Sequence, residues 1–322
     1  MDGIYANGAG PMTILQMLVI ARWIHFTAVF TLFGSAFFWF YAGERPSPVG
    51  ADDLPASRRA TATLLRVAAP VAAISGIVWL AGILANMANG FKDVLDLPTL
   101  RLFFMETQFG TVAFLRLILL AVAALVSLSP WRGRAWFSAQ LHIGAMLLIN
   151  QAWLGHASEG GAGPYGALMI IAYSLHVLAV AAWVGGLPPL LFALIEQGAE
   201  RGLAARQRML DLCRRFSRMG IVAVALACAT GLANAGFRTG FSLEKLLHTD
   251  YGDVLLAKAG VVAMMLALAG YNRFVAMPRL SAAAPEQPVN SGALRSSIAI
   301  ELILGILALG AAAVLGVTPP PQ

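Results

Sequence analysis

The stretch LMIIAYSLHVLAVAAWVGGLPPLLFALI, residues 168–195, decides the fold of this chain. It contains no Asp, Glu, Lys or Arg, and it is longer than the roughly 20 apolar residues that a bilayer-spanning helix needs. The rest of the chain has the same character, because 59% of its 322 residues are hydrophobic and only 12% are charged. This composition excludes a water-soluble fold and predicts an all-α, polytopic integral membrane protein that contacts membrane lipid.

Apolar windows of about 19 residues predict eight transmembrane helices and no soluble domain. Small-residue pairs at positions 34–35 and 185–186 should permit close helix approach, and Pro188-Pro189 should bend the fifth helix near its centre. The expected helices span residues 13–41, 63–87, 110–129, 135–154, 168–195, 216–237, 254–272 and 294–317.

Basic residues are concentrated in alternate connections between these helices. The first, third, fifth and seventh connections hold most of the arginines, whereas the other three hold only Lys92, Arg101, Arg238 and Lys245. Because basic residues favour the cytoplasmic side, we expect a multi-pass protein of the bacterial inner membrane with both termini in the periplasm. The same rule accounts for the formal net charge of +6, so we expect no nucleic-acid partner.

Two short patterns recur in the same order and indicate an internal repeat. A Thr-x-aromatic-Gly-x-Val motif followed by a basic residue occurs twice, and so does a histidine nine residues before a glycine. We therefore expect two related four-helix halves, residues 1–160 and 161–322, arranged as parallel repeats. The repeated elements are ETQFGTV at 106–112 with Arg116, HTDYGDV at 248–254 with Lys258, His25 with Gly34, and His176 with Gly185.

The two repeated basic residues lie inside helices. Arg116 and Lys258 are about 9 Å from the outer ends of the third and seventh predicted helices, at 1.5 Å per residue. The favoured interpretation is that both side chains snorkel to the outer headgroups. The alternative is that they are fixed charges lining an outer vestibule.

Ionisable residues inside the spans are where function is to be sought, because burying one without a partner costs roughly 2.5 kcal/mol or more. Each histidine among them has three interpretations: a buried hydrogen-bonding group, a proton relay or a metal ligand. The residues are Arg22, His25, His142, His176 and Glu301.

Two predicted helices carry stripes that combine imidazole with thioether. This pair of donors suits copper, particularly Cu(I), better than it suits hard cations, although each methionine can equally fill core space. The stripes are His142, Met146, Asn150 and Trp153 on the fourth helix, with His156 beyond it, and Met169, His176 and Trp183 on the fifth.

Residues 175–187, LHVLAVAAWVGGL, resemble the central signature of the copper resistance D (CopD) family of bacterial membrane proteins. Three further motifs support the resemblance: Gly155-His156-Ala157, Thr249-Asp250-Tyr251-Gly252 and Tyr271-Asn272-Arg273. The resemblance implies an inner-membrane protein of copper homeostasis that moves copper from periplasm to cytoplasm. It also implies a periplasmic copper-binding partner of the CopC type, which here would be a separate protein.

The resemblance assigns His156 and His176 as the matching histidines, with His25 as their repeat-related companion. Copper captured near His156 and Met105 or Met169 would pass to His176 and His25. Because metal binds the neutral imidazole, binding should weaken as the pH falls through about 6.5. The full set of candidate metal ligands is His25, His142, His156, His176, Met105, Met146 and Met169.

Two other functions are alternatives to copper transport. A b-type haem could be ligated by His25 and His142 if these lie at similar depth, which would make the chain a redox protein. The chain could instead be a scaffold that docks a periplasmic copper chaperone. No Walker loop, GxGxxG, HExxH or GxSxG motif is present, so we expect no enzymatic activity outside the haem alternative.

Overall fold

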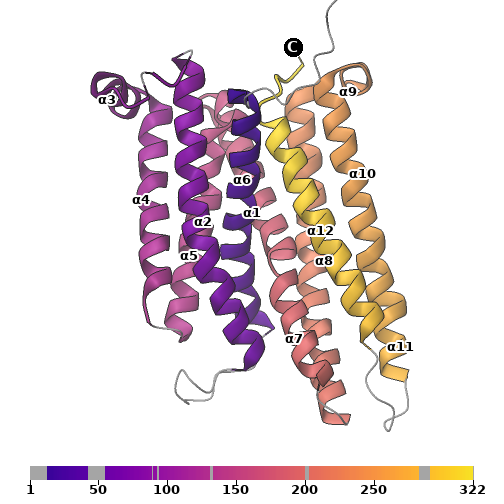
Figure 1. The fold of residues 1–322 in the computed structure, drawn as a ribbon. Coiled ribbons are helices and arrows are strands. Elements are labelled where there is room, and N and C mark those ends of the chain that lie inside the picture. Colours follow the sequence, from indigo (N-terminus) through magenta and orange to yellow (C-terminus); the bar gives the residue numbers. More distant parts are fainter. Residues whose placement is uncertain are drawn as a thin grey trace, which may run out of the picture.

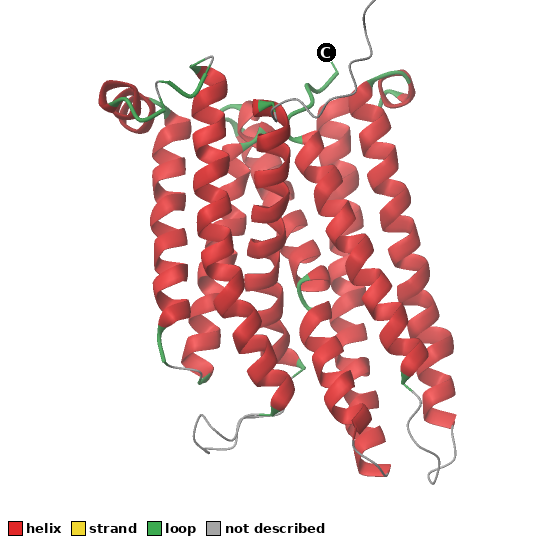
Figure 2. Ribbon diagram, in the orientation of Figure 1, coloured by secondary structure: helices red, strands yellow, loops and turns green. Residues whose placement is uncertain are grey.

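A computed structural model describes residues 13–42, 55–88, 90–92, 94–130, 133–199, 203–282 and 291–321. Throughout these ranges the regular structure is helical, and the long helices run side by side in one bundle (Figures 1 and 2). In chain order the elements are α1 (Ile14–Tyr41), α2 (Ala56–Met87), α3 (Leu97–Glu106), α4 (Gln108–Leu128), α5 (Arg134–Asn150), η2 (Gln151–Leu154), η3 (His156–Gly160), α6 (Pro164–Val184), α7 (Leu187–Ala199), α8 (Leu203–Thr239), α9 (Leu243–Leu247), α10 (Asp250–Tyr271), η4 (Asn272–Ala276), α11 (Met277–Ala282) and α12 (Gly292–Leu315).

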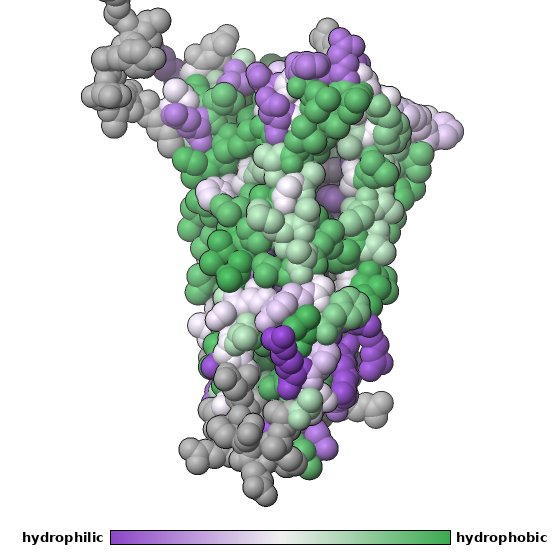
Figure 3. Space-filling model, turned by 90° about the vertical axis from the view of Figure 1, so that its right-hand side faces the viewer, coloured by the Kyte–Doolittle hydropathy of each residue, from purple (hydrophilic) through white to green (hydrophobic). Residues whose placement is uncertain are grey.

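Within the described ranges, seven helical segments are long and apolar enough to cross a membrane. They are α1, α2, α4, α8, α12, the α6–α7 pair, and α10 with its extension through η4 and α11. The helix α5, with 17 residues, is shorter than these and is prolonged by the 3₁₀ turn η2. Figure 3 shows an apolar band between hydrophilic ends on one face of the bundle. The prediction of an all-α polytopic membrane protein is confirmed, with seven spans established by length and composition.

Both described ends of the chain lie at the same end of the bundle (Figure 1). A hydrogen bond of 2.9 Å from Arg22 Nη1 in α1 to the Gly316 carbonyl just beyond α12 joins the two regions. The short helices α3 and α9 also lie at this end, each directly before a long helix. We call this end of the bundle the terminal end.

The predicted bend in the fifth helix is present, and it lies at glycines rather than at the prolines. The helix α6 ends at Val184 and α7 begins at Leu187, so Gly185 and Gly186 form the break. Pro188 and Pro189 then occupy the first turn of α7, where the N–H that proline lacks would have no helical partner. The glycines and prolines together divide one membrane-length segment into two helices.

A close crossing of α1 and α6 depends on two glycines. A Cβ atom on Gly34 would lie 2.0 Å from the Ala181 carbonyl oxygen, and one on Gly185 would lie 2.1 Å from that of Phe30. Ser35 Oγ donates a hydrogen bond of 2.7 Å to the Gly185 carbonyl. The predicted close approach is therefore confirmed, and it joins the two glycines that stand nine residues after His25 and His176.

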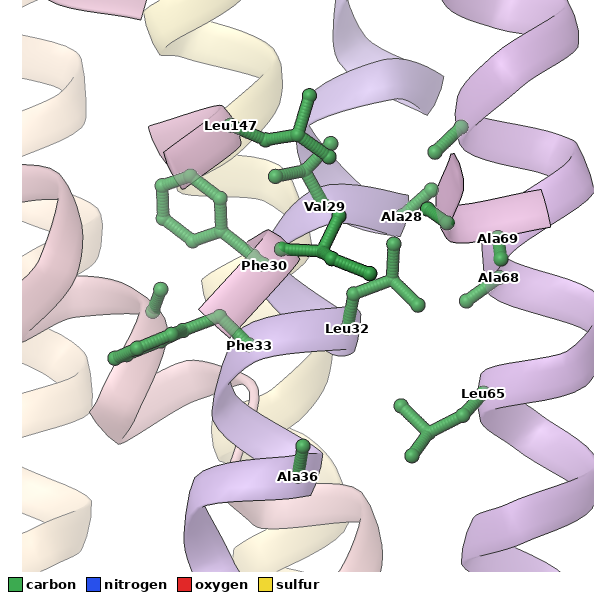
Figure 4. Packing of buried hydrophobic residues seen from close by; sticks show 14 of the residues in the cluster. Ala28, Val29, Phe30, Leu32, Phe33, Ala36, Leu65, Ala68, Ala69 and Leu147 are labelled. Carbon is green, nitrogen blue, oxygen red and sulfur yellow. The ribbon is translucent and has the colours of Figure 1, made fainter. Parts of the chain in front are cut away.

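Apolar side chains fill the space between α1, α2 and α5. Val29 and Leu32 from α1 pack with Leu65 and Ala69 from α2 and with Leu147 from α5 (Figure 4). These side chains are almost wholly buried. Because bilayer lipid is as apolar as they are, this contact is stabilised by close packing more than by exclusion of water. It places α1 in contact with both α2 and α5.

The helix α8 begins well before the predicted span at residues 216–237. It runs from Leu203 to Thr239, and its 37 residues correspond to about 55 Å, compared with a hydrocarbon core of about 30 Å. Its first four turns contain four of the arginines that the sequence assigned to a connection, namely Arg206, Arg208, Arg214 and Arg215. This part of the predicted connection is thus a helical extension of the span.

Candidate functional site

His25 is fully buried at the centre of the first four long helices, and both of its ring nitrogens are engaged. Nδ1 lies 2.8 Å from the Ala72 carbonyl oxygen in α2, and Nε2 lies 2.6 Å from Nη2 and 3.2 Å from Nε of Arg116 in α4. A carbonyl can only accept, so Nδ1 carries the proton and Nε2 accepts from the guanidinium. The lone pair that a metal would need is therefore occupied by Arg116.

The Arg116 side chain ties together three further groups. Its Nη1 donates to the Leu147 carbonyl at 3.0 Å and to Asn150 Oδ1 at 3.1 Å, and Asn150 Nδ2 donates to the Val112 carbonyl at 3.2 Å. The guanidinium carbon also lies 5.4 Å from the centroid of the Trp79 ring. Snorkelling of Arg116 is therefore wrong: its side chain is 1% exposed and lies across the helix bundle because these acceptors satisfy its donors.

His176 occupies a similar position in α6, but its ring is only partly engaged. Nδ1 lies 3.0 Å from the Ala227 carbonyl oxygen and 3.2 Å from Thr230 Oγ1, both in α8. The ring can approach α8 because position 231 is glycine, where a Cβ atom would lie 3.1 Å from His176 Cε1. No hydrogen bond to Nε2 is formed by any residue that the structure describes. His176 thus presents an imidazole nitrogen whose lone pair is open.

The surroundings of the two histidines match in detail. In each case Nδ1 faces the carbonyl of an alanine in a neighbouring helix. Three residues after that alanine stands a Ser or Thr, whose hydroxyl donates to the backbone carbonyl of the residue four positions before it. Four residues after the alanine stands a glycine that contacts the imidazole ring. The matching sets are Ala72, Ser75 and Gly76 in α2 and Ala227, Thr230 and Gly231 in α8. These matching residues lie outside the sequence motifs from which the repeat is predicted.

The basic residues of the repeat are placed by equivalent helix starts. Thr107 and Thr249 cap α4 and α10 through bonds to the amides of Gly110 and Gly252, at 2.8 and 3.1 Å. Lys258 in α10 and Arg116 in α4 therefore each stand nine residues after the capping threonine. No hydrogen bond joins the Lys258 and His176 side chains, whereas Arg116 donates to His25 Nε2. This difference between guanidinium and ammonium separates the two otherwise matching sites.

The outer candidate ligands are near the terminal end of the bundle. Met169 is buried in α6, and a Cβ atom on Gly160 of η3 would lie 2.7 Å from its sulfur. The helical turn η3 begins at His156, whose side chain lies outside the described residues. The structure thus brings the Met169 thioether to the turn that contains His156. Met105, at the end of α3, is exposed.

The predicted stripe on α5 does not form one continuous face. His142 and Met146 are exposed, whereas Asn150 is buried against Arg116. Steps of four residues exceed the helical repeat of 3.6, so each step turns the side chain by about 40°. Two such steps carry the face from the outside of the bundle to its interior.

The haem alternative requires His25 and His142 at one depth, and the structure separates them. Nδ1 of His142 is bonded at 2.6 Å to the carbonyl of Ser138 in its own helix, and the residue is exposed. Gly144, two residues further, packs against Phe33. Phe33 stands eight residues, or about 12 Å, beyond His25 along α1. This arrangement does not support a shared axial pair.

Among the residues that the structure describes, no group of three or more His, Cys, Asp and Glu side chains could hold a metal ion. A copper site at His176 must therefore draw on thioethers, backbone oxygens or the His156 side chain. Sequence reasoning missed the acceptors on α2 and α8, and it missed the contact between Arg116 and His25. The sequence offered one signal for that contact. Each set of repeated motifs contains one histidine and one basic residue, His25 with Arg116 and His176 with Lys258, and only arginine has the forked guanidinium that can donate several hydrogen bonds.

Two family models match this chain. Residues 12–167 match the family described as copper resistance protein D-like, N-terminal domain, and residues 210–315 match copper resistance protein D. No solved structure matches the chain significantly.

Three relatives show how far the similarity extends. The chain is 31% identical over 263 residues to inner membrane protein YebZ of Escherichia coli (strain K12), which covers 81% of this chain and 85% of YebZ. It is 27% identical to copper resistance protein D of Pseudomonas syringae pv. tomato, over 94% of this chain and 96% of that protein. It is 29% identical to copper transport protein CutJ of Bacillus subtilis (strain 168), over 57% of this chain and 34% of CutJ.

Proposed function

The chain belongs to the copper resistance protein D family, and from this premise we propose that it is an inner-membrane copper permease. Copper moves from the periplasm to the cytoplasm down its own gradient, since the sequence has no nucleotide-binding motif and no hydrolytic motif. The protein performs no enzymatic reaction. The names of the relatives from Pseudomonas syringae and Bacillus subtilis, which specify copper resistance and copper transport, support the choice of cargo.

One observation carries the proposal: His176 leaves Nε2 open where His25 gives the same nitrogen to Arg116. The hydrogen bond from Nδ1 to the Ala227 carbonyl in α8 fixes the ring tautomer, as a carbonyl partner does for the other ring nitrogen of a metal-ligating histidine. Copper binds at His176 Nε2, and His25 with Arg116 forms a fixed framework in the first half. The sequence-based expectation that His25 also ligates copper is replaced by this role.

The path into the protein begins at the terminal end of the bundle. His156 and Met169 receive copper there, because η3 begins at His156 and the buried Met169 sulfur packs against the same turn. Met105 on the exposed end of α3 is an outer contact for the incoming metal. A separate periplasmic copper-binding protein of the CopC type delivers the ion to this end.

The topology that fits this path has eight membrane crossings in two halves, residues 1–160 and 161–322. The eighth crossing is α5 with η2, and both termini are periplasmic. Three features support this arrangement: the matching environments of His25 and His176, the matching helix starts at Thr107 and Thr249, and the position of both described chain ends at one end of the bundle.

The proposed function is tested by copper uptake into proteoliposomes that contain a trapped Cu(I)-chelating dye. We expect His176→Ala to reduce the initial rate at least about tenfold, because it removes the open imidazole nitrogen. His142→Ala is the matched control, since His142 is exposed and bonded only within its own helix. Equal uptake by the His176 and His142 variants, each with wild-type thermal stability, would overturn the proposal.

A further inference from the structure

A cavity of about 270 Å³ lies between α8, α10 with η4, and α12, in the half of the bundle away from the terminal end. Most of its lining is apolar, with a few polar side chains among the apolar ones. The site at His176 and Thr230 does not include this cavity. The polar and sulfur-bearing lining residues are Trp183, Cys213, Ser217, Asn272, Arg273, Met277 and Glu301.

Glu301 is a buried carboxylate without a cationic partner among the described residues. Its side chain on α12 is 2% exposed. Oε1 accepts from Trp183 Nε1 at 2.7 Å, and Oε2 accepts from Asn272 Nδ2 at 3.4 Å. Both donors are neutral, so they orient the carboxylate without neutralising it. A charge in this setting is costly unless a cation or a proton joins it.

Asn272 provides the second observation that points to a ligand. The residue is 9% exposed, and its Oδ1 is buried without any hydrogen-bond partner. The bond from Nδ2 to Glu301 fixes the orientation of the amide, so Oδ1 cannot exchange places with the nitrogen. Asn272 also begins the π-helical turn η4, a type of irregularity that is frequent at functional sites. A buried amide oxygen in this state calls for a donor or a cation.

Cys213 adds a soft donor to the same cavity. Its thiol on α8 is buried, whereas Cys228, fifteen residues further along the same helix and not part of the cavity lining, is exposed. Thiolate and thioether sulfurs are the preferred ligands of Cu(I), and the Met277 thioether lines the same cavity, with carboxylate and amide oxygens as the other donors there. Arg273 also lines the cavity, where its Nη1 donates to Ser217 Oγ at 2.5 Å.

The cavity is connected to His176 through one helix. Trp183 stands seven residues after His176 in α6, about 10 Å further from the terminal end, and its indole bonds Glu301. We propose that the cavity is a second Cu(I) site, formed by Glu301, Asn272 Oδ1 and Cys213, which receives copper from His176 on its way inward. This inference rests on the proposed function, from which it takes the identity of the cargo.

The test is an anaerobic titration of the purified full-length protein with Cu(I) against a competing Cu(I) chelator. We expect wild-type protein to bind two Cu(I) per chain, and Glu301→Gln and Cys213→Ser to bind one. Cys228→Ser is the matched control and should retain two. Cys213→Ala should also bind one Cu(I), and it removes the thiol without introducing the hydroxyl of serine. Thermal unfolding verifies that each variant is folded.

The result separates this inference from the proposed function. X-ray absorption of the His176→Ala protein loaded with one Cu(I) should contain a sulfur scatterer that disappears when Cys213→Ser is added. If the Glu301 and Cys213 variants retain both ions while His176→Ala loses one, the inner site is overturned and the proposed function stands. If His176→Ala retains both ions while the Glu301 and Cys213 variants lose one, the inner site stands and the role of His176 is overturned.

Discussion

Gly34→Ala will destabilise the folded protein by at least about 3 kcal/mol, the upper part of the range for overpacked interiors. The added methyl group would lie 2.0 Å from the Ala181 carbonyl oxygen and 2.5 Å from Gly185 Cα. Both atoms belong to the backbone, so no side-chain rotation can make room. The α1–α6 crossing must separate, and Ser35 Oγ then loses its bond to the Gly185 carbonyl. Thermal unfolding in detergent measures the effect.

The control for this variant is Gly260→Ala in α10, where no atom lies within 4 Å of an added Cβ. Alanine has a higher helix propensity than glycine, so this variant should be as stable as the parent or slightly more stable. Equal unfolding temperatures for the two variants would show that the α1–α6 crossing has room for a methyl group at position 34, contrary to the structure.

Arg116→Met will cost about 3 kcal/mol, because three buried acceptors each lose a donor, although one of them, the Leu147 carbonyl, keeps its bond from the Gln151 amide. These are His25 Nε2, the Leu147 carbonyl and Asn150 Oδ1. Methionine is apolar and flexible enough to fill the space, but it offers no hydrogen to any of them. The midpoint of thermal unfolding should fall clearly, and copper uptake by the protein that remains folded should persist at low temperature.

The repeat supplies a matched variant, Lys258→Met. Lys258 makes no hydrogen bond with the described residues, so its replacement should cost less than about 1 kcal/mol, as for other substitutions that break no buried network. The opposite result, a large loss of stability in the Lys258 variant and none in the Arg116 variant, would contradict the proposal that His25 with Arg116 is structural and that His176 binds copper.

Much of the fold could be predicted from the sequence because membrane spans are set by local hydropathy. The segments of α1, α4, α10 and α12 are each long and apolar enough to identify without knowledge of their neighbours. The helix α8 was harder, because its first turns carry arginines and a charged helix outside the bilayer has no hydropathy signal. The sequence predicts a bend at Pro188-Pro189, whereas the break lies at Gly185 and Gly186, where α6 crosses α1 at Gly34.

The candidate site was less predictable, because a histidine can bind a metal only if a ring nitrogen has a lone pair that no hydrogen-bond donor occupies, and the sequence does not show those donors. His25 and His176 have the same spacing to a glycine in sequence, yet only the structure shows Arg116 on Nε2 of the first. His142 fitted a stripe by spacing, but the stripe turns outward at that residue. Glu301 and Asn272 meet although they are 29 residues apart, across a connection whose geometry no local pattern specifies.

Nitrogen NMR of histidine-labelled protein during addition of Cu(I) reports which imidazole nitrogen binds the metal. The chain has five histidines, and the His176→Ala and His142→Ala spectra assign two of their signals. We predict that Cu(I) shifts the Nε2 resonance of His176 and leaves the Nε2 bonded to Arg116 unchanged. A shift at the His25 nitrogen, with the His176 resonance unmoved, would contradict the account.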